Sequence, residues 1–183
     1  MSRITTPATI SDAPEASQPL LKGVEKMLGS APNMFRLIGN SSATLEGYLG
    51  LNGALQKGKI SAATRERIAL AVANTNGCDY CNSAHTFLAK TFAKLDEAEL
   101  AANRAGSSSD AKAHAAVAFA VKVATNRGQV SADDISSVKA AGYSDAEVVE
   151  IVAHVALNVL TNYINEVFKT DIDFPVVELA EAA

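Results

Sequence analysis

Apolar residues recur three and four positions apart along most of this chain, in blocks separated by short turns rich in glycine, proline and asparagine. This spacing is typical of amphipathic α-helices, which gather such residues on one face. No stretch shows the strict alternation of apolar and polar residues expected of a half-buried strand. The pattern therefore predicts an all-α protein, with helices over approximately residues 19–28, 32–38, 41–56, 61–75, 78–92, 96–106, 110–126, 131–141 and 144–168.

The starts of the predicted helices carry recognisable capping residues. Asp96 with Glu99, and Ser144 with Glu147, have the spacing of a capping box, in which two side chains satisfy amides at the start of a helix. Between two predicted helices, residues 107–109 are three consecutive serines, for which we expect a flexible joint.

The length of 183 residues suits one compact domain with a substantial core. Residues 1–17 contain two prolines and several serines and threonines, which predicts an extended N-terminal arm. We expect residues 18–183 to form a single helical domain. Its tail, residues 170–175, is non-helical in pattern and predicted to pack its apolar residues onto the body.

Composition and charge narrow the class of protein. The chain is 48% hydrophobic but only 5% aromatic, which favours closely packed helices over a β-sandwich. A net charge of −4 argues against nucleic-acid binding, which typically uses a basic surface. The N-terminus lacks a signal-peptide pattern, and the longest apolar stretch, interrupted by His154 and Asn158, is too short for a bilayer. We therefore expect a cytoplasmic protein with neither a nucleic-acid nor a membrane partner.

The two cysteines are the strongest chemical signal, in the segment Cys78-Asp79-Tyr80-Cys81, with His85 four residues later. In a reducing compartment, such a pair is more often catalytic or metal-binding than a structural disulfide. On a helix, positions three and seven apart share a face, so Cys78, Cys81 and His85 are predicted to lie together. Gly77 places Cys78 at the start of this helix, where unpaired amides favour an anion, so we expect a lowered pKa for the Cys78 thiol.

Glu66 lies on the preceding predicted helix, and the Asn76–Gly77 turn folds that helix against the cysteine helix. A carboxylate beside an imidazole can hold its tautomer and take part in proton transfer. The sequence therefore favours Glu66 as a partner of the cysteine face. A surface ion pair with the neighbouring Arg65 or Arg67 is the alternative.

Two non-catalytic interpretations stay open. Zinc would take Cys78, Cys81, His85 and Glu66 as ligands, but three of them on one helix would be crowded, and the chain has no second CxxC. The cysteines would otherwise be small buried apolar residues beside a core histidine. Covalent haem attachment is excluded, because Asn82 stands where a histidine is required.

The segments 66–73 and 77–81, followed by His85, resemble the core of the AhpD-like alkylhydroperoxidase / carboxymuconolactone decarboxylase family, and most closely its peroxidase-related branch. Residues 158–165 and 170–175 also resemble that branch. The motif core covers about residues 61–93, and a weaker likeness extends from about residue 20 to residue 175.

This resemblance implies an all-helical AhpD-like fold that assembles into trimers or hexamers and reduces hydroperoxides without a metal or cofactor, using an external dithiol or lipoyl-type reductant. By the same likeness, Cys81 is the attacking thiol and Cys78 the resolving one, while Glu66 and His85 form the proton relay. Some members carry a histidine at the position of Tyr80. Tyrosine does not titrate near neutral pH, which places a relay through that position in doubt.

Two other functions compete with a thiol peroxidase. One is a disulfide reductase or adaptor that recycles a partner peroxidase. The other is a non-redox protein of this family, either decarboxylase-like or an oligomeric binding protein. The resemblance implies that the decarboxylase branch does not depend on a cysteine pair, so the intact motif argues against that activity.

A polar stripe, His154, Asn158 and Asn162, runs along the last predicted helix at four-residue spacing. A hydrogen-bonded seam between helices or subunits is the favoured interpretation, with a pocket lining as the alternative. Tyr48 and Tyr163 are further candidates for a pocket wall.

Overall fold

The computed structural model describes residues 2–177, and within them every regular element is helical. This confirms the predicted all-α class. The helices begin and end within a few residues of the positions expected from the sequence. They are η1 (Ile10–Asp12), η2 (Glu15–Ser17), α1 (Gln18–Leu28), α2 (Asn33–Ile38), α3 (Ser42–Leu55), α4 (Ala62–Thr75), α5 (Asp79–Thr91), α6 (Glu97–Arg104), α7 (Ala111–Thr125), α8 (Ala132–Ala140) and α9 (Asp145–Phe168).

The N-terminal arm predicted over residues 1–17 is only partly extended. It contains the two 3-10 turns η1 and η2, which pack on α1 and bury Ala13 and Ser17. The apolar Ala13 belongs to the core, and this burial explains why the segment folds back. Residue 1 and residues 178–183 of the predicted domain lie outside the described residues, and the division at residue 17 stays a prediction.

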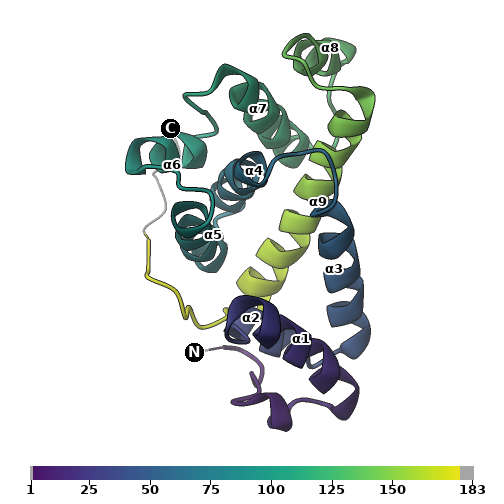
Figure 1. The fold of residues 1–183 in the computed structure, drawn as a ribbon, viewed down its shortest axis with the longest axis vertical. Coiled ribbons are helices and arrows are strands. Elements are labelled where there is room, and N and C mark those ends of the chain that lie inside the picture. Colours follow the sequence, from purple (N-terminus) through teal and green to yellow (C-terminus); the bar gives the residue numbers. More distant parts are fainter. Residues whose placement is uncertain (1, 178–183) are drawn as a thin grey trace.

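Two helices organise the molecule. In Figure 1, α9 runs through the middle from the end near α8 to the end near α1 and α2, with α3 alongside it. Helix α4 packs against α5, α6, α7 and α9. All residues from Ile68 to Ala73 are buried, so α4 is enclosed on every side. Three alanines in that stretch let the neighbouring helices approach closely.

The core divides into clusters on either side of the α4–α9 crossing. One joins α4, α7, α8 and α9, and its fully buried side chains include Ile68, Val72 and Ile151. Another joins α1, α2, the end of α4 and the start of α5. Cys78, Tyr80 and Cys81 belong to this second cluster, so the cysteine motif is held by core packing.

Helix α9 is the one helix among the described residues that is long and apolar enough to cross a membrane by length and composition alone. It packs on α3, α4, α5, α7 and α8, and its buried face includes His154, Asn158, Asn162 and Asn165. Buried packing and internal polar residues are typical of the core helix of a globular protein. The cytoplasmic location stays a prediction.

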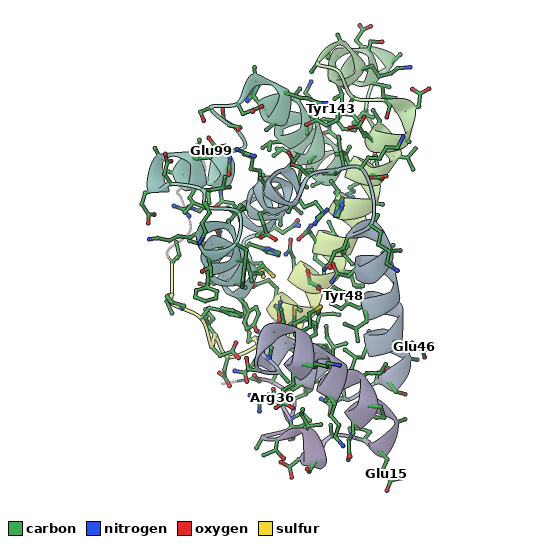
Figure 2. The ribbon with its side chains drawn as sticks, in the orientation of Figure 1. Glu15, Arg36, Glu46, Tyr48, Glu99 and Tyr143 are labelled. Carbon is green, nitrogen blue, oxygen red and sulfur yellow. The ribbon has the colours of Figure 1, made fainter. Side chains whose placement is uncertain are left out.

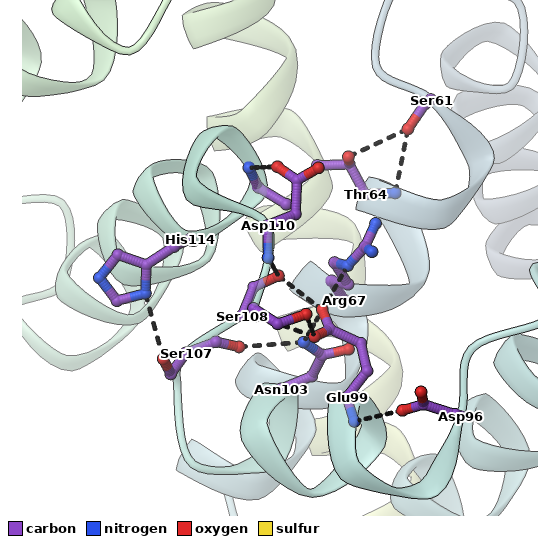
Figure 3. Close-up of polar contacts among 12 residues, drawn as sticks. Ser61, Thr64, Arg67, Asp96, Glu99, Asn103, Ser107, Ser108, Asp110 and His114 are labelled. Carbon is purple, nitrogen blue, oxygen red and sulfur yellow. Dashed lines mark hydrogen bonds and ion pairs between the residues drawn. The ribbon is translucent and has the colours of Figure 1, made fainter.

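The serine segment 107–109 is not a flexible joint. Glu99, on α6, accepts five hydrogen bonds, from Arg67 Nε, Asn103 Nδ2, Ser108 Oγ, and the amide and hydroxyl of Ser109, at 2.5–2.9 Å. Figure 3 shows these contacts tying the segment to α4 and α6. Burial opposes the charge of Glu99, but hydrogen bonds from Ser108, Ser109 and Asn103 outweigh it and hold its pKa well below the usual range.

The capping box predicted at the start of α6 forms only in part. Asp96 Oδ1 accepts a hydrogen bond from the Glu99 amide at 2.8 Å, as predicted. The Glu99 side chain does not return to the backbone of Asp96, because it is engaged with the serine segment. The capping box of α9, between Ser144 and Glu147, forms in full.

Candidate functional site

The turn between α4 and α5 determines where the cysteines lie. Gly77 has a φ of +67°, a left-handed conformation that glycine adopts without strain. The Cys78 amide donates to the Ala73 carbonyl at 3.0 Å and closes α4. Cys78 then acts as N-cap of α5, because its Sγ accepts a hydrogen bond from the Cys81 amide at 3.2 Å. The predicted placement of the motif at a helix start is confirmed.

The two thiols are both free and buried but have different surroundings. Cys81, 2% exposed, lines a cavity of about 800 Å³ bounded by α3, α4, α5, α9 and the C-terminal tail. Cys78 is fully buried in the core cluster beside the start of α5. A small molecule in the cavity would therefore meet the Cys81 sulfur.

The pKa values of the two thiols also differ, and the thiol that lines the cavity is the more acidic one. Burial opposes ionisation of Cys81, but a hydrogen bond from the Cys78 thiol, the charge of His85, and hydrogen bonding by Asn165 and Asn162 together lower its pKa to about 7. The hydrogen bond to Cys81, followed by burial, raises the pKa of Cys78 far above its ordinary value, so the lowered pKa expected for Cys78 at the helix start was wrong. Cys81 is thus about half ionised near pH 7 and mostly thiolate above it, while Cys78 remains the thiol that donates to it.

Helix α9 supplies polar support to Cys81. Asn165 Nδ2 donates to Cys81 Sγ at 3.2 Å. Asn162, one turn earlier, accepts a hydrogen bond from Asn76 Nδ2 at 2.8 Å, which fixes its side chain beside the α4–α5 turn. Amide N–H groups directed at sulfur stabilise the thiolate over the thiol.

Glu66 and His85 meet at the cavity wall. His85 Nδ1 lies 2.9 Å from Glu66 Oε2, and both side chains line the cavity with Cys81. Burial disfavours the imidazolium, but the charge and hydrogen bond of Glu66 outweigh it and, with the charge of Cys81, raise the pKa of His85. Burial, together with the charges of Cys81 and Glu66, also raises the pKa of Tyr48. Tyr48 points inward from α3 toward α9 (Figure 2) and keeps its proton.

Besides α5, the helices α3, α4 and α9 contribute polar side chains to the cavity. On α3, Tyr48 is followed at four-residue spacing by Asn52 and Gln56. The polar members of the lining on the three helices are Tyr48, Asn52, Gln56, Arg65, Glu66, His154, Asn158 and Thr161.

The polar stripe of His154, Asn158 and Asn162 on α9 forms a seam between helices only in part. Asn162 forms the expected seam between helices, through Asn76. His154 and Asn158 line the cavity, so the favoured interpretation was wrong for both of them. Tyr163 is 60% exposed and takes no part in the cavity wall.

Tyr80, between the two cysteines, holds the C-terminal tail. Its hydroxyl accepts from the Met34 amide at 3.2 Å and donates to Asp173 Oδ1 at 2.9 Å. Its ring packs edge-to-face on Phe174, with centroids 5.8 Å apart. The motif thereby fastens the tail across α5, where Asp173 and Phe174 complete one side of the cavity.

The structure thus brings together Cys81, His85 and Glu66 around one cavity, with Cys78 in contact with Cys81. Sequence reasoning missed Asn165. Asn158 and Asn162 lie on the same face of α9 as Asn165 and could have pointed to it. The partner of Asn165 is Cys81, 84 residues earlier, and a contact over that separation leaves no local signal in the sequence. Within residues 2–177 no three His, Cys, Asp or Glu side chains form a group suited to hold a metal ion.

Comparison with known structures supports this fold. One similar structure is that of an AhpD-core, peroxidase-related protein from Ralstonia eutropha JMP134, with 23% identity, a TM-score of 0.83, and coverage of 94% of this chain and 92% of that one. A peroxidase-related protein from Silicibacter sp. TM1040 gives 20% identity, a TM-score of 0.80, and coverage of 99% and 95%.

The debrominase Bmp8, as a cysteine-to-alanine variant in complex with 2,3,4-tribromopyrrole, gives 24% identity, a TM-score of 0.78, and coverage of 94% of each chain. No curated protein matches the sequence. Residues 43–126 match the model of the carboxymuconolactone decarboxylase family, and this segment contains Glu66, both cysteines and His85. The segment that holds the cysteine motif thus matches the carboxymuconolactone decarboxylase family model, and the chain as a whole shares the fold of the AhpD-core structures.

Proposed function

We propose that this protein is a thiol-dependent peroxidase that reduces organic hydroperoxides with Cys81 and Cys78. The observation that carries the proposal is the position of Cys81, a thiol of lowered pKa at the wall of a large cavity. The Glu66–His85 pair beside it, at 2.9 Å, is the kind of oriented acid–base group that such chemistry uses.

The first step oxidises Cys81. The thiolate attacks the terminal oxygen of the hydroperoxide, an S–O bond forms, and the O–O bond breaks. The alkoxide that leaves takes a proton from the His85 imidazolium and departs as the alcohol. The hydroperoxide is reduced by two electrons, and Cys81 becomes a sulfenic acid. Because Glu66 raises the pKa of His85, more of that imidazolium is present near neutral pH than for an ordinary histidine.

The second step engages Cys78. Its sulfur attacks the sulfenic sulfur of Cys81, an S–S bond forms, and the hydroxyl leaves as water with the proton that Cys78 loses. The hydrogen bond between Cys78 Sγ and the Cys81 amide places the two residues within one turn of α5. Near neutral pH Cys78 is a thiol in the resting protein, so it does not compete for the peroxide.

An external dithiol restores the pair by thiol–disulfide exchange. Because Cys81 is only 2% exposed and is reached through the cavity, a slender dithiol of the lipoyl type fits better than the surface dithiol of a folded protein. For the same reason, direct reduction of peroxide is favoured over an adaptor that recycles a separate peroxidase.

We further propose that the chain forms a homo-oligomer through α9. Five large apolar or aromatic residues, three to eight positions apart, are exposed along this helix, namely Val149, Val152, Leu160, Tyr163 and Val167. A continuous exposed apolar face typically marks a contact surface, here with a second copy. Sedimentation velocity of wild type and Val152→Glu tests this; a wild type that sediments as a monomer would refute it.

Reductive debromination is a second candidate, because a debrominase shares this fold and the cavity is apolar on one side. The reaction would consume the same two thiols: the carbon exchanges bromine for hydrogen, and the products are bromide and the disulfide. Bromide release from a brominated pyrrole, without peroxide consumption, would favour this candidate.

The test of the proposed function is oxidation of the reduced protein by tert-butyl hydroperoxide. Wild type should form the Cys78–Cys81 disulfide with one equivalent of peroxide, seen as a loss of two hydrogens in the intact mass. Steady-state turnover with several dithiols then identifies the reductant. No oxidation of Cys81 by the peroxide would refute the peroxidase.

A further inference from the structure

The cavity has a cationic end away from the thiol. Arg65, on α4, lines the cavity, and its Nη1 donates to the Ile60 carbonyl at 2.8 Å. Within residues 2–177, no carboxylate lies within 4 Å of the Arg65 nitrogens. The guanidinium carries five N–H donors, so most of its donors remain for a ligand.

His154 faces the same region from α9. It is 4% exposed, and its buried Nε2 has no hydrogen-bond partner among the described residues. A buried polar nitrogen without a partner costs stability, typically about 1–3 kcal/mol, and a ligand atom in the cavity would remove that cost. Burial first, and then the charge of Arg65, lowers the pKa of His154 to about 4, so it meets a ligand as a neutral imidazole.

Another part of the cavity lining is apolar. It is contributed by α1, α2, α5 and the tail. Its large side chains include Met27, Met34, Phe35, Phe87, Leu88 and Phe174. An occupant that satisfies both parts of the lining has a hydrocarbon body and one polar end.

The two ends of the cavity are well separated. An α-helix rises about 1.5 Å per residue, which places His154 about 12 Å along α9 from Asn162. Asn162 and Asn165 stand beside Cys81. A molecule of medium chain length can therefore reach Arg65 and His154 with one end and Cys81 with the other.

We infer that the substrate class is a hydroperoxide that carries a carboxylate at the end of an apolar chain. The carboxylate accepts hydrogen bonds from Arg65 and His154, the chain packs on the apolar part of the lining, and the hydroperoxide meets Cys81. A monoanion fits better than a dianion such as a phosphate monoester, because the negative charges of Glu150 and Glu66 also act on His154. This inference rests on the proposed peroxidase activity.

The experiment compares ω-hydroperoxydecanoate with its methyl ester as oxidants of Cys81 in wild type, Arg65→Gln and Lys57→Gln. Lys57 is an exposed lysine after α3 and serves as the charge-matched control. The wild type should prefer the acid. Arg65→Gln should lower kcat/KM for the acid at least about tenfold, which corresponds to about 1.4 kcal/mol. The ratio of kcat/KM for the acid to that for the ester should fall by the same factor, whereas Lys57→Gln should leave kcat/KM for all three oxidants unchanged.

A binding measurement separates this inference from the proposed function. Reduced wild type should bind ω-hydroxydecanoate, which cannot oxidise a thiol, more tightly than its methyl ester in isothermal titration calorimetry. Failure of tert-butyl hydroperoxide to oxidise Cys81 would refute the peroxidase while leaving this preference intact. Equal affinity for acid and ester in wild type, or an equal loss for both in Arg65→Gln, would overturn the carboxylate site.

Discussion

Asn165 donates a hydrogen bond to the sulfur of Cys81 at 3.2 Å, joining the last helix to the first turn of α5. The amide is a donor in this contact, so it favours the thiolate as acceptor. Asn165 is itself buried, and this contact is set by the packing of α9. The lowered pKa of Cys81 therefore depends on α9 as well as on the motif that contains the thiol.

Removal of this donor should make Cys81 less acidic. In Asn165→Ala, the thiolate loses a charge-assisted hydrogen bond worth about 1.5–3 kcal/mol, so the pKa of Cys81 should rise by about one unit or more. The pH profile of Cys81 alkylation by iodoacetamide, followed by mass spectrometry, measures this pKa. In wild type, the half-maximal alkylation rate is expected near pH 7.

The matched control for this variant is Asn158→Ala, two turns earlier on the same helix. The Asn158 amide donates to the His154 carbonyl and not to sulfur, so the alkylation profile should match wild type. A profile for Asn165→Ala that superimposes on that of the control would show that Asn165 does not set the acidity.

Loss of the Glu66 charge should act on Cys81 through His85. The carboxylate raises the pKa of His85, so Glu66→Gln should lower it and reduce the fraction of imidazolium near neutral pH. Since the charge of His85 lowers the pKa of Cys81, the alkylation midpoint should move to higher pH. Glu46→Gln on the outer face of α3 is the control. An unchanged midpoint in Glu66→Gln would remove Glu66 from the relay.

Tyr80→Phe should release the tail without removing the ring from the core. The variant loses the hydroxyl that contacts Met34 and Asp173, at an expected cost of about 1–3 kcal/mol in the free energy of unfolding. Hydrogen exchange of residues 170–177 should accelerate, and urea denaturation should shift to lower midpoints. Tyr163→Phe, at an exposed position, should change neither measurement. Unaltered tail exchange in Tyr80→Phe would contradict the tether.

Glu99→Ala should destabilise the fold far more than Glu97→Ala on the same helix. It leaves the partly buried Arg67 without its carboxylate and frees the donors of segment 107–109, at a cost of about 3 kcal/mol. Glu97 pairs with Lys90 at the surface, where ion pairs contribute about 0–1 kcal/mol. Urea denaturation at pH 7 compares them; equal midpoints would contradict the structural role of Glu99.

The stability provided by Glu99 should also depend on pH. Its pKa is lowered by folding, so its contribution is present above the unfolded value near 4.5 and is lost as the pH falls toward the folded value. The difference between wild type and Glu99→Ala should therefore shrink between pH 5 and pH 3. A difference that grows as the pH falls would contradict this sign.

Local signals in the sequence predicted the helices and much of the site. Glycine and asparagine marked the α4–α5 turn, Ser144 and Glu147 marked the start of α9, and helical spacing placed Cys81 and His85 on one face. Long-range contacts were not predictable in this way. The serine segment looked flexible because its partner, Glu99, was assigned to a cap, and the role of Tyr80 depends on Asp173, 93 residues later.

The most direct test of the central claim is to trap the oxidised form of Cys81. Reduced Cys78→Ser, treated with one equivalent of tert-butyl hydroperoxide and then with dimedone, should carry the adduct on Cys81, located by peptide mass spectrometry. Cys81→Ser should carry none, since Cys78 is fully buried outside the cavity lining and its burial still opposes ionisation of the thiol. An adduct on Cys78 in Cys81→Ser at a comparable rate, or none on Cys81 in Cys78→Ser, would contradict the assignment of Cys81 as the peroxide-reducing thiol.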